Sequence, residues 1–147
     1  MRYKHRVISG LTSASLGDRN LPPKKVKGLK ASGLAYERKV NKILRENYSA
    51  ITSQWIHFSD INGYGYAQPD AFIEKDTFVL CIEIKLKENS VGYLQMFQLY
   101  RPLLEHIYKK PVYCLQICKN YGSDDSEVCS IEKMLKAPKL GNYCYSL

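Results

Sequence analysis

Three charged side chains close together in the sequence have the types and spacing needed to hold a metal ion and a phosphate. Glu83 and Lys85 follow an apolar run from Phe78 to Ile82, and Asp70 precedes that run. Residues two apart on a strand project from the same face, so Glu83 and Lys85 are expected to share one. If a hairpin brings Asp70 alongside, two carboxylates converge, and hard divalent cations such as Mg²⁺ or Mn²⁺ prefer such oxygen ligands.

This combination suits the hydrolysis of a phosphodiester bond. A bound metal ion polarises a phosphoryl oxygen and lowers the pKa of a bound water, and a nearby cation stabilises the developing charge. Lys85 is the candidate for that cation, although it could instead position or deprotonate the attacking water. The alternative interpretation is a surface salt bridge between Glu83 and Lys85 with no catalytic role.

The elements that must position these residues follow from the spacing of apolar side chains. A helix is expected from Ala31 to about Tyr48, with Ser32 available as its N-cap. Three strands are expected, at residues 54–59, 71–73 and 78–85. The last two form a hairpin, and residues 62–65 are expected to form a turn or loop before it.

A second helix is expected at residues 91–108, in which Pro102 could produce a kink, and Pro111 introduces a further strand. The C-terminal region is expected to contain a polar loop, a short helix and an edge strand, at residues 123–126, 131–135 and 143–147. The order helix, three strands, helix, strand predicts an α/β fold with a mixed central sheet flanked by helices.

The motif Pro69-Asp70 followed by Glu83-x-Lys85 resembles that of the PD-(D/E)XK nuclease superfamily, whose restriction-endonuclease-like core is a mixed sheet flanked by helices. The segment that begins at Gly33 and contains Glu37-Arg38 resembles the Gly-x-x-x-Glu-Arg helix of archaeal-type Holliday junction resolvases. VRR-type nucleases have a comparable helix glutamate. The resemblance covers about residues 30–120 and leaves both ends of the chain outside.

The resemblance implies a fuller set of metal ligands. Beside Asp70 and Glu83, it adds the backbone carbonyl of Ile84. It also brings Glu37 to the metal, either as a direct ligand or through a water molecule. The alternative for Glu37 is a solvated helix glutamate.

One further position matches the family in part. Gln95 resembles the glutamine that follows the Glu-x-Lys strand in VRR-type and related nucleases, and it would join the catalytic residues. RecB-type members have a tyrosine four residues after this glutamine. Here Leu99 occupies that position and the tyrosine is Tyr100, so the RecB subfamily is not assigned.

Positive charge is concentrated in the first third of the chain. Residues 1–45 hold 12 of the 22 Lys and Arg but only 2 of the 14 acidic residues, and the formal net charge is +8. Such a distribution favours a polyanion partner, and the alternative is a solubilising tail. Residues 1–30 are expected to form a basic arm with little regular structure, before a nuclease domain at 31–147 with its core at about 31–120. The residues expected to bind DNA are Lys24, Lys25, Lys27, Lys30, Arg38, Lys39 and Lys87.

Several other residues are weaker candidates. Asp60, Ser59 and His57 precede the Pro69-Asp70 motif and could join the site, and His106 lies on the second expected helix; a packing role is favoured for both histidines. Two exposed-type aromatic residues, Tyr64 and Tyr66, alternate with glycines and could either stack on unpaired bases or pack on the sheet.

The cysteines and the hydropathy place further bounds. Five cysteines without a C-x-x-C pair predict buried free thiols, and Cys114 and Cys118 would share one strand face. No run of about 18 apolar residues and no signal-peptide pattern occurs, so no membrane partner is expected. The expected location is intracellular, in the cytoplasm or nucleoid of a microbial host, and a phage-encoded enzyme would fit.

The sequence therefore predicts a Mg²⁺- or Mn²⁺-dependent DNA endonuclease, and the resemblance favours branched DNA such as a Holliday junction. A single small site cuts one strand, so cutting two strands calls for a homodimer. The alternatives are a site-specific endonuclease of restriction or homing type, and a non-catalytic nucleic-acid-binding protein in which Glu83 and Lys85 are structural.

Overall fold

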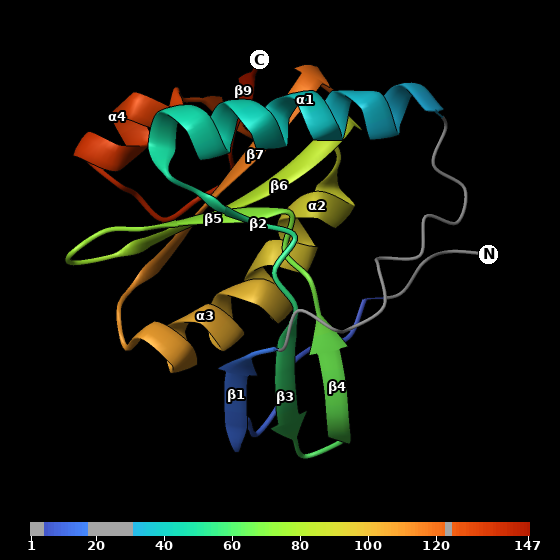
Figure 1. Cartoon of the computed structure of the whole chain (residues 1–147), viewed down its shortest axis with the longest axis vertical. Helices are drawn as coiled ribbons and strands as arrows, with labels where there is room; N and C mark the ends of the chain where they lie inside the picture. The colour runs from blue at the N-terminus through green and yellow to red at the C-terminus, as the bar shows by residue number, and fades with distance from the viewer. Residues whose placement is uncertain (1–4, 18–30, 123–124) are drawn as a thin grey trace.

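The computed structural model describes residues 5–17, 31–122 and 125–147, and its centre is a mixed six-stranded sheet flanked by helices (Figure 1). In spatial order the strands are β2 (Ile51–Thr52), β5 (Ala71–Glu74), β6 (Val79–Lys87), β7 (Val112–Asn120), β9 (Tyr143–Ser146) and β8 (Glu127–Val128). Strand β6 is antiparallel to β5 and parallel to β7. The predicted α/β class with a mixed central sheet is confirmed.

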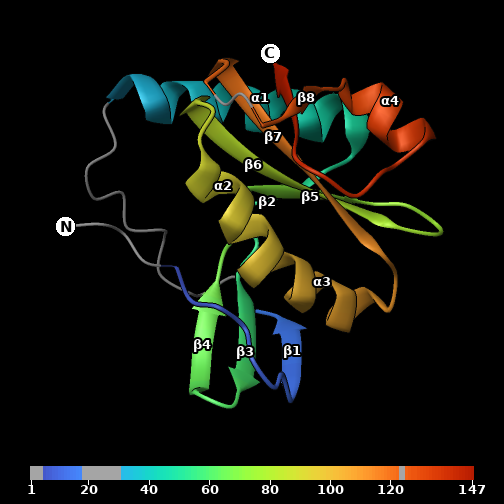
Figure 2. The same cartoon turned by 180° about the vertical axis from the view of Figure 1, so that it is seen from behind.

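Helices cover both faces of this sheet (Figures 1 and 2). Helices α1 (Ala31–Tyr48) and α4 (Ile131–Lys136) lie on one face, and the segment from α2 to α3 lies on the other. Strand β6 contributes to both layers, because Leu80 and Ile82 pack toward α1 while Val79 and Cys81 pack toward α3. Helix α1 has the expected bounds, and the side chain of its expected N-cap, Ser32, lies outside the described residues.

The second expected helix is interrupted by a wider turn. It consists of α2 (Ser90–Gln95), the π-helical turn η1 (Met96–Tyr100) and α3 (Arg101–Tyr108). Pro102 lies in the first turn of α3 and has no N–H to donate to the carbonyl of Gln98, four residues earlier. The N–H of Ile8 donates to that carbonyl instead, at 3.0 Å. The irregularity expected at Pro102 therefore takes the form of a π-helical turn just before it.

A smaller antiparallel sheet lies beside the main one, in the order β1 (Ser13–Leu16), β3 (Ile56–Asp60) and β4 (Gly63–Ala67). Two expectations were wrong here. The segment expected to form a turn at 62–65 is mostly strand β4, and the hairpin turn is Ile61-Asn62, closed by the pairing of Asp60 with Gly63. The arm expected to lack regular structure contains β1, which pairs with β3.

The reason for the strand at β4 is the close packing of its inner face. A Cβ atom added to Gly65 would lie 2.4 Å from Cζ of Phe58, so only glycine lets β4 approach the ring of its neighbour. Glycine in this segment therefore serves close approach within a strand, whereas the sequence pattern suggested a turn. Residues 18–30, which make up the rest of the expected arm, lie outside the described residues.

The C-terminal region differs from expectation at one point. The short helix α4 is confirmed, but β9 lies between β7 and β8 and so is an interior strand, and β8 is the edge. A two-residue strand such as β8 was too short to recognise from sequence. No helix in the described residues has both the length and the apolar character needed to cross a membrane.

Candidate active site

The hairpin of β5 and β6 sets the two candidate carboxylates side by side. Ala71 pairs with Ile82, so continuing the register by one residue places Asp70 opposite Glu83. Both side chains are almost completely buried, at 3% and 1% exposure. The N–H of Ile84 donates to Oδ2 of Asp70 at 2.8 Å, which ties the residue before β5 to the backbone of β6. The convergence expected from the sequence is present, while the ligand roles of these residues stay a prediction.

Lys85 lies on the same face of β6 as Glu83, because alternate strand residues project to one side. Its side chain is half-buried, whereas Glu83 is buried. A carboxylate inside the site and an ammonium group toward its opening are therefore positioned by one strand. This is the arrangement that would place a positive charge beside a phosphate held at the two carboxylates.

Buried thiols line the same face just below the carboxylates. Cys81 pairs with Cys114 across β6 and β7, and all five cysteines are free. The hydrogen bond with Cys114 and complete burial raise the pKa of the Cys81 thiol, and the charges of Glu83 and Asp70 raise it further. The thiol therefore stays protonated and does not offer a thiolate ligand. Cys114 and Cys118 are buried on one strand face, as expected.

Glu37 is placed differently from the other carboxylates. It is half-buried on α1, and α1 packs on the opposite face of the sheet through Tyr36, Val40 and Leu44. Within the described parts of the chain, no three His, Cys, Asp or Glu side chains form a group that could hold a metal ion. Two carboxylates still suit Mg²⁺, which commonly binds one or two carboxylates together with water and substrate phosphate. The role of Glu37 remains a prediction.

Gln95 is buried on α2, and its side-chain N–H donates to the hydroxyl of Tyr100 at 2.8 Å. The two residues are five apart, a spacing that the π-helical turn η1 brings onto one side of the helix. The tyrosine that falls one position late in the sequence thus meets the glutamine through the extra residue of the turn. Sequence spacing counted on a regular α-helix could not show this contact.

A second glutamine, which sequence reasoning missed, fixes the start of α2 beside the site. Gln116 is the register partner of Glu83 on β7 and is completely buried. Its amide accepts from the N–H of Asn89 at 2.9 Å and donates to the carbonyl of Asn89 at 3.0 Å. The side chain of Asn89 in turn caps α2 by accepting from the N–H of Gly92. An isolated polar residue in an apolar strand was the only sequence signal for this role.

The remaining candidates fall into two groups. The basic residues Arg38 and Lys39 on α1 and Lys87 at the end of β6 are exposed, whereas Lys24, Lys25, Lys27 and Lys30 lie outside the described residues. His106 is half-buried on α3. His57 and Ser59 lie on β3 of the small sheet, so they do not belong to the face that carries Asp70 and Glu83.

Asp60 has a structural role. It lies at the end of β3, where it accepts hydrogen bonds from Arg6 and from the N–H groups of Ser9 and Asn62. Burial raises the pKa of Asp60, but the bonds from Arg6 and from the two backbone groups outweigh it and lower the pKa overall. The carboxylate is therefore ionised and committed to holding the N-terminal segment against the hairpin of β3 and β4.

Comparisons of this chain with protein-family models, with curated proteins and with solved structures give no match.

Proposed function

We propose that this chain is a metal-dependent nuclease that hydrolyses phosphodiester bonds in DNA, with Asp70, Glu83 and Lys85 at its catalytic centre. The observation that carries the proposal is the placement of Asp70 opposite Glu83, both buried, with Lys85 two residues along the same strand face. A buried pair of carboxylates is costly unless it binds a cation or shares a proton. The motif and the order of elements support the same family of enzymes.

Each residue has a distinct task in this proposal. Asp70 and Glu83, with the backbone carbonyl of Ile84, hold Mg²⁺ or Mn²⁺, which when bound polarises the phosphoryl oxygen and activates water. Ile84 keeps Asp70 oriented through its N–H. Lys85 stabilises the charge that develops on the phosphate, or positions the attacking water. Glu37 and Gln95 complete the set.

The family resemblance also supports the proposed substrate. Branched DNA such as a Holliday junction is the substrate class that we propose, and cleavage of both strands would need a homodimer. The exposed Arg38, Lys39 and Lys87 would contact phosphates. An intracellular location follows from a DNA substrate. The contact between Gln95 and Tyr100 favours this reading, because it reproduces across a π-helical turn a pairing that resembles the glutamine and tyrosine of RecB-type nucleases.

The test is cleavage of labelled four-way junction, flap, duplex and single-stranded DNA with Mg²⁺ or Mn²⁺, with EDTA as the metal-free control. We expect Lys85→Ala and Glu83→Gln to lose about 10²-fold or more in rate while binding persists. Lys139→Ala removes an exposed lysine far along the chain and serves as the matched charge control. Cleavage that survives in Lys85→Ala would overturn the assignment.

Binding without cutting on any substrate would support the non-catalytic alternative instead. Cutting of one duplex sequence in preference to branched DNA would support the restriction or homing type. The three outcomes use the same set of labelled substrates, so one experiment separates them.

A further inference from the structure

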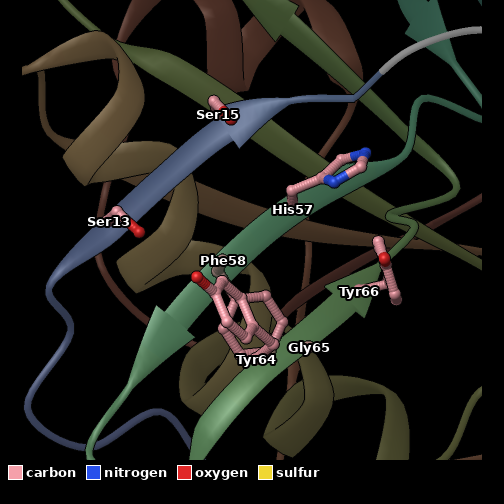
Figure 3. A pocket seen from close by; sticks show the side chains of 7 residues that line it. All are labelled: Ser13, Ser15, His57, Phe58, Tyr64, Gly65 and Tyr66. Carbon is pink, nitrogen blue, oxygen red and sulfur yellow. The ribbon is translucent and has the colours of Figure 1, made fainter.

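The small sheet has a polar and aromatic outer face that the proposed catalytic centre does not use. Two cross-strand rows make up this face, because directly paired residues share a side of the sheet. One row is Ser13, Ser59 and Tyr64, and the other is Ser15, His57 and Tyr66. These side chains line an open pocket of about 410 Å³ (Figure 3).

The two tyrosines are unusually exposed for aromatic residues in strands. Tyr64 is 88% and Tyr66 is 60% exposed, and the only ring contact of Tyr66 within the described residues is the edge of His57, at 4.8 Å between centroids. Figure 3 shows both rings standing on β4 at the open side of the pocket. Of the two readings of these tyrosines, packing on the sheet fails, because they contribute nothing to the core behind it.

The backbone beneath the tyrosines is held in place. The guanidinium of Arg6 donates to the carbonyls of Tyr64 at 2.8 Å and Gly63 at 2.7 Å, and it also pairs with Asp60. On the inner side, Phe58 is buried against β4 and stacks under Arg6. A surface held in this way loses little conformational entropy when a ligand binds, which favours recognition by stacking.

The charge around this face suits a polyanion. Asp60 is the single acidic residue in the three strands, and it points inward to Arg6. Segment 19–30, which follows β1 in the sequence, contains five basic and no acidic residues. Hydroxyl groups of serine and tyrosine are common donors to phosphate oxygens. The face has no aliphatic side chain of the kind that forms the centre of a protein interface.

We propose that this outer face binds the unpaired bases of a single-stranded DNA segment, which stack on Tyr64 and Tyr66. Two residues along a strand span about 6.6 Å, roughly twice the ~3.4 Å rise per nucleotide of DNA. Neighbouring bases must therefore separate to occupy both rings, which a single strand can do more readily than a duplex. The choice of DNA as ligand rests on the proposed nuclease function, which this inference extends to a substrate with a single-stranded segment.

The position of the face in the chain links it to the catalytic centre. Strand β4 ends at Ala67, and Gln68 and Pro69 lead directly to Asp70. Tyr66 and Asp70 are four residues apart, so their Cα atoms are within about 14 Å. Bases stacked on β4 would therefore belong to a segment within about four nucleotides of the phosphate that is cut. A flap or a junction with an opened arm offers such a segment.

The test is binding of a fluorescein-labelled oligothymidylate and of a duplex of equal length, by anisotropy in EDTA, where no cleavage occurs. We expect Tyr64→Ala and Tyr66→Ala each to weaken binding of the single strand about 5-fold or more, and to change duplex binding less than about 2-fold. Tyr64→Phe and Tyr66→Phe keep the ring and should keep binding. Tyr121→Ala, which removes a tyrosine 47% exposed outside the small sheet, is the matched control.

Equal losses for single strand and duplex, or no loss in either alanine variant, would overturn the proposal. Concentration-dependent dissociation of a dimer in Tyr64→Ala, with DNA binding unchanged, would assign the face to a second copy of the chain and would also overturn it. If DNA is never cleaved but single-strand binding depends on the tyrosines, this inference stands and the nuclease falls. If cleavage depends on Lys85 but binding ignores the tyrosines, the reverse holds.

Discussion

The carboxylate of Asp70 accepts a hydrogen bond from the backbone N–H of Ile84, and both residues are buried. Asp70→Ala would leave that N–H without this acceptor and should destabilise the fold by about 1–3 kcal/mol. Asp70→Asn keeps an oxygen acceptor of similar size, so we expect less than half of that loss. Both variants should lose cleavage. Urea unfolding together with the junction-cleavage assay separates the two effects, and equal destabilisation by Asn and Ala would contradict this account of the bond.

Gly92 leaves room for the buried amide of Gln116. A Cβ atom at position 92 would lie 2.7 Å from Nε2 of Gln116, which is held at both ends by Asn89. We expect Gly92→Ala to displace the amide and lower the free energy of unfolding by about 1–3 kcal/mol. Ser90→Ala, at an exposed position of the same helix, is the control. In the double variant Gly92→Ala/Gln116→Ala the losses should add to less than their sum, because the clash is removed.

The bond between the N–H of Ile8 and the carbonyl of Gln98 depends on the proline that follows in the helix. Pro102→Ala supplies an N–H that can donate to the same carbonyl within the helix. We expect the Ile8 amide to exchange its hydrogen faster in Pro102→Ala than in the wild type, as measured by hydrogen exchange. Val91→Ala in α2 is the control for a general loss of helix stability. Unchanged protection of Ile8 would show that its bond does not depend on the missing donor.

Stability at alkaline pH should depend on Tyr36. Burial raises the pKa of this tyrosine from 10.0 to about 12, although the hydrogen bond to the carbonyl of Leu147 acts the other way. Because the folded state holds the proton more tightly than the unfolded state, the contribution is complete below pH 10 and is lost as the pH rises to about 12. The free energy of unfolding should therefore fall less steeply over this range in Tyr36→Phe. Equal slopes for the two proteins would contradict the prediction.

The parts of the fold that were predictable have strong local patterns. Helix α1 and strand β6 are recognisable because their apolar residues repeat with periods of about 3.6 and 2 over many residues. The same period of 2 was enough to place Glu83 and Lys85 on one face. The approach of Asp70 was predictable because a hairpin fixes the pairing of its two strands.

The parts that were not predictable depend on contacts between distant segments. Strand β1 is built of small residues and exists because it pairs with β3, some forty residues later. The contact between Gln95 and Tyr100 needs the π-helical turn, which arises next to Pro102 and the bond from Ile8. Local spacing contains no record of these partners, so a regular helix was the natural expectation.

The alternation of β6 also limits how a chain of this kind can change in length during evolution. One residue gained or lost within Phe78–Ile82 would turn Glu83 and Lys85 toward α1 and turn Ile84 toward α2, which would bury charge in an apolar layer and empty the site in one step. Exposed residues at the tip of the hairpin, Lys75–Thr77, can absorb insertions without this exchange. Descendants of this chain should therefore carry their gaps at the hairpin tip and none inside the strand, even where most side chains have diverged.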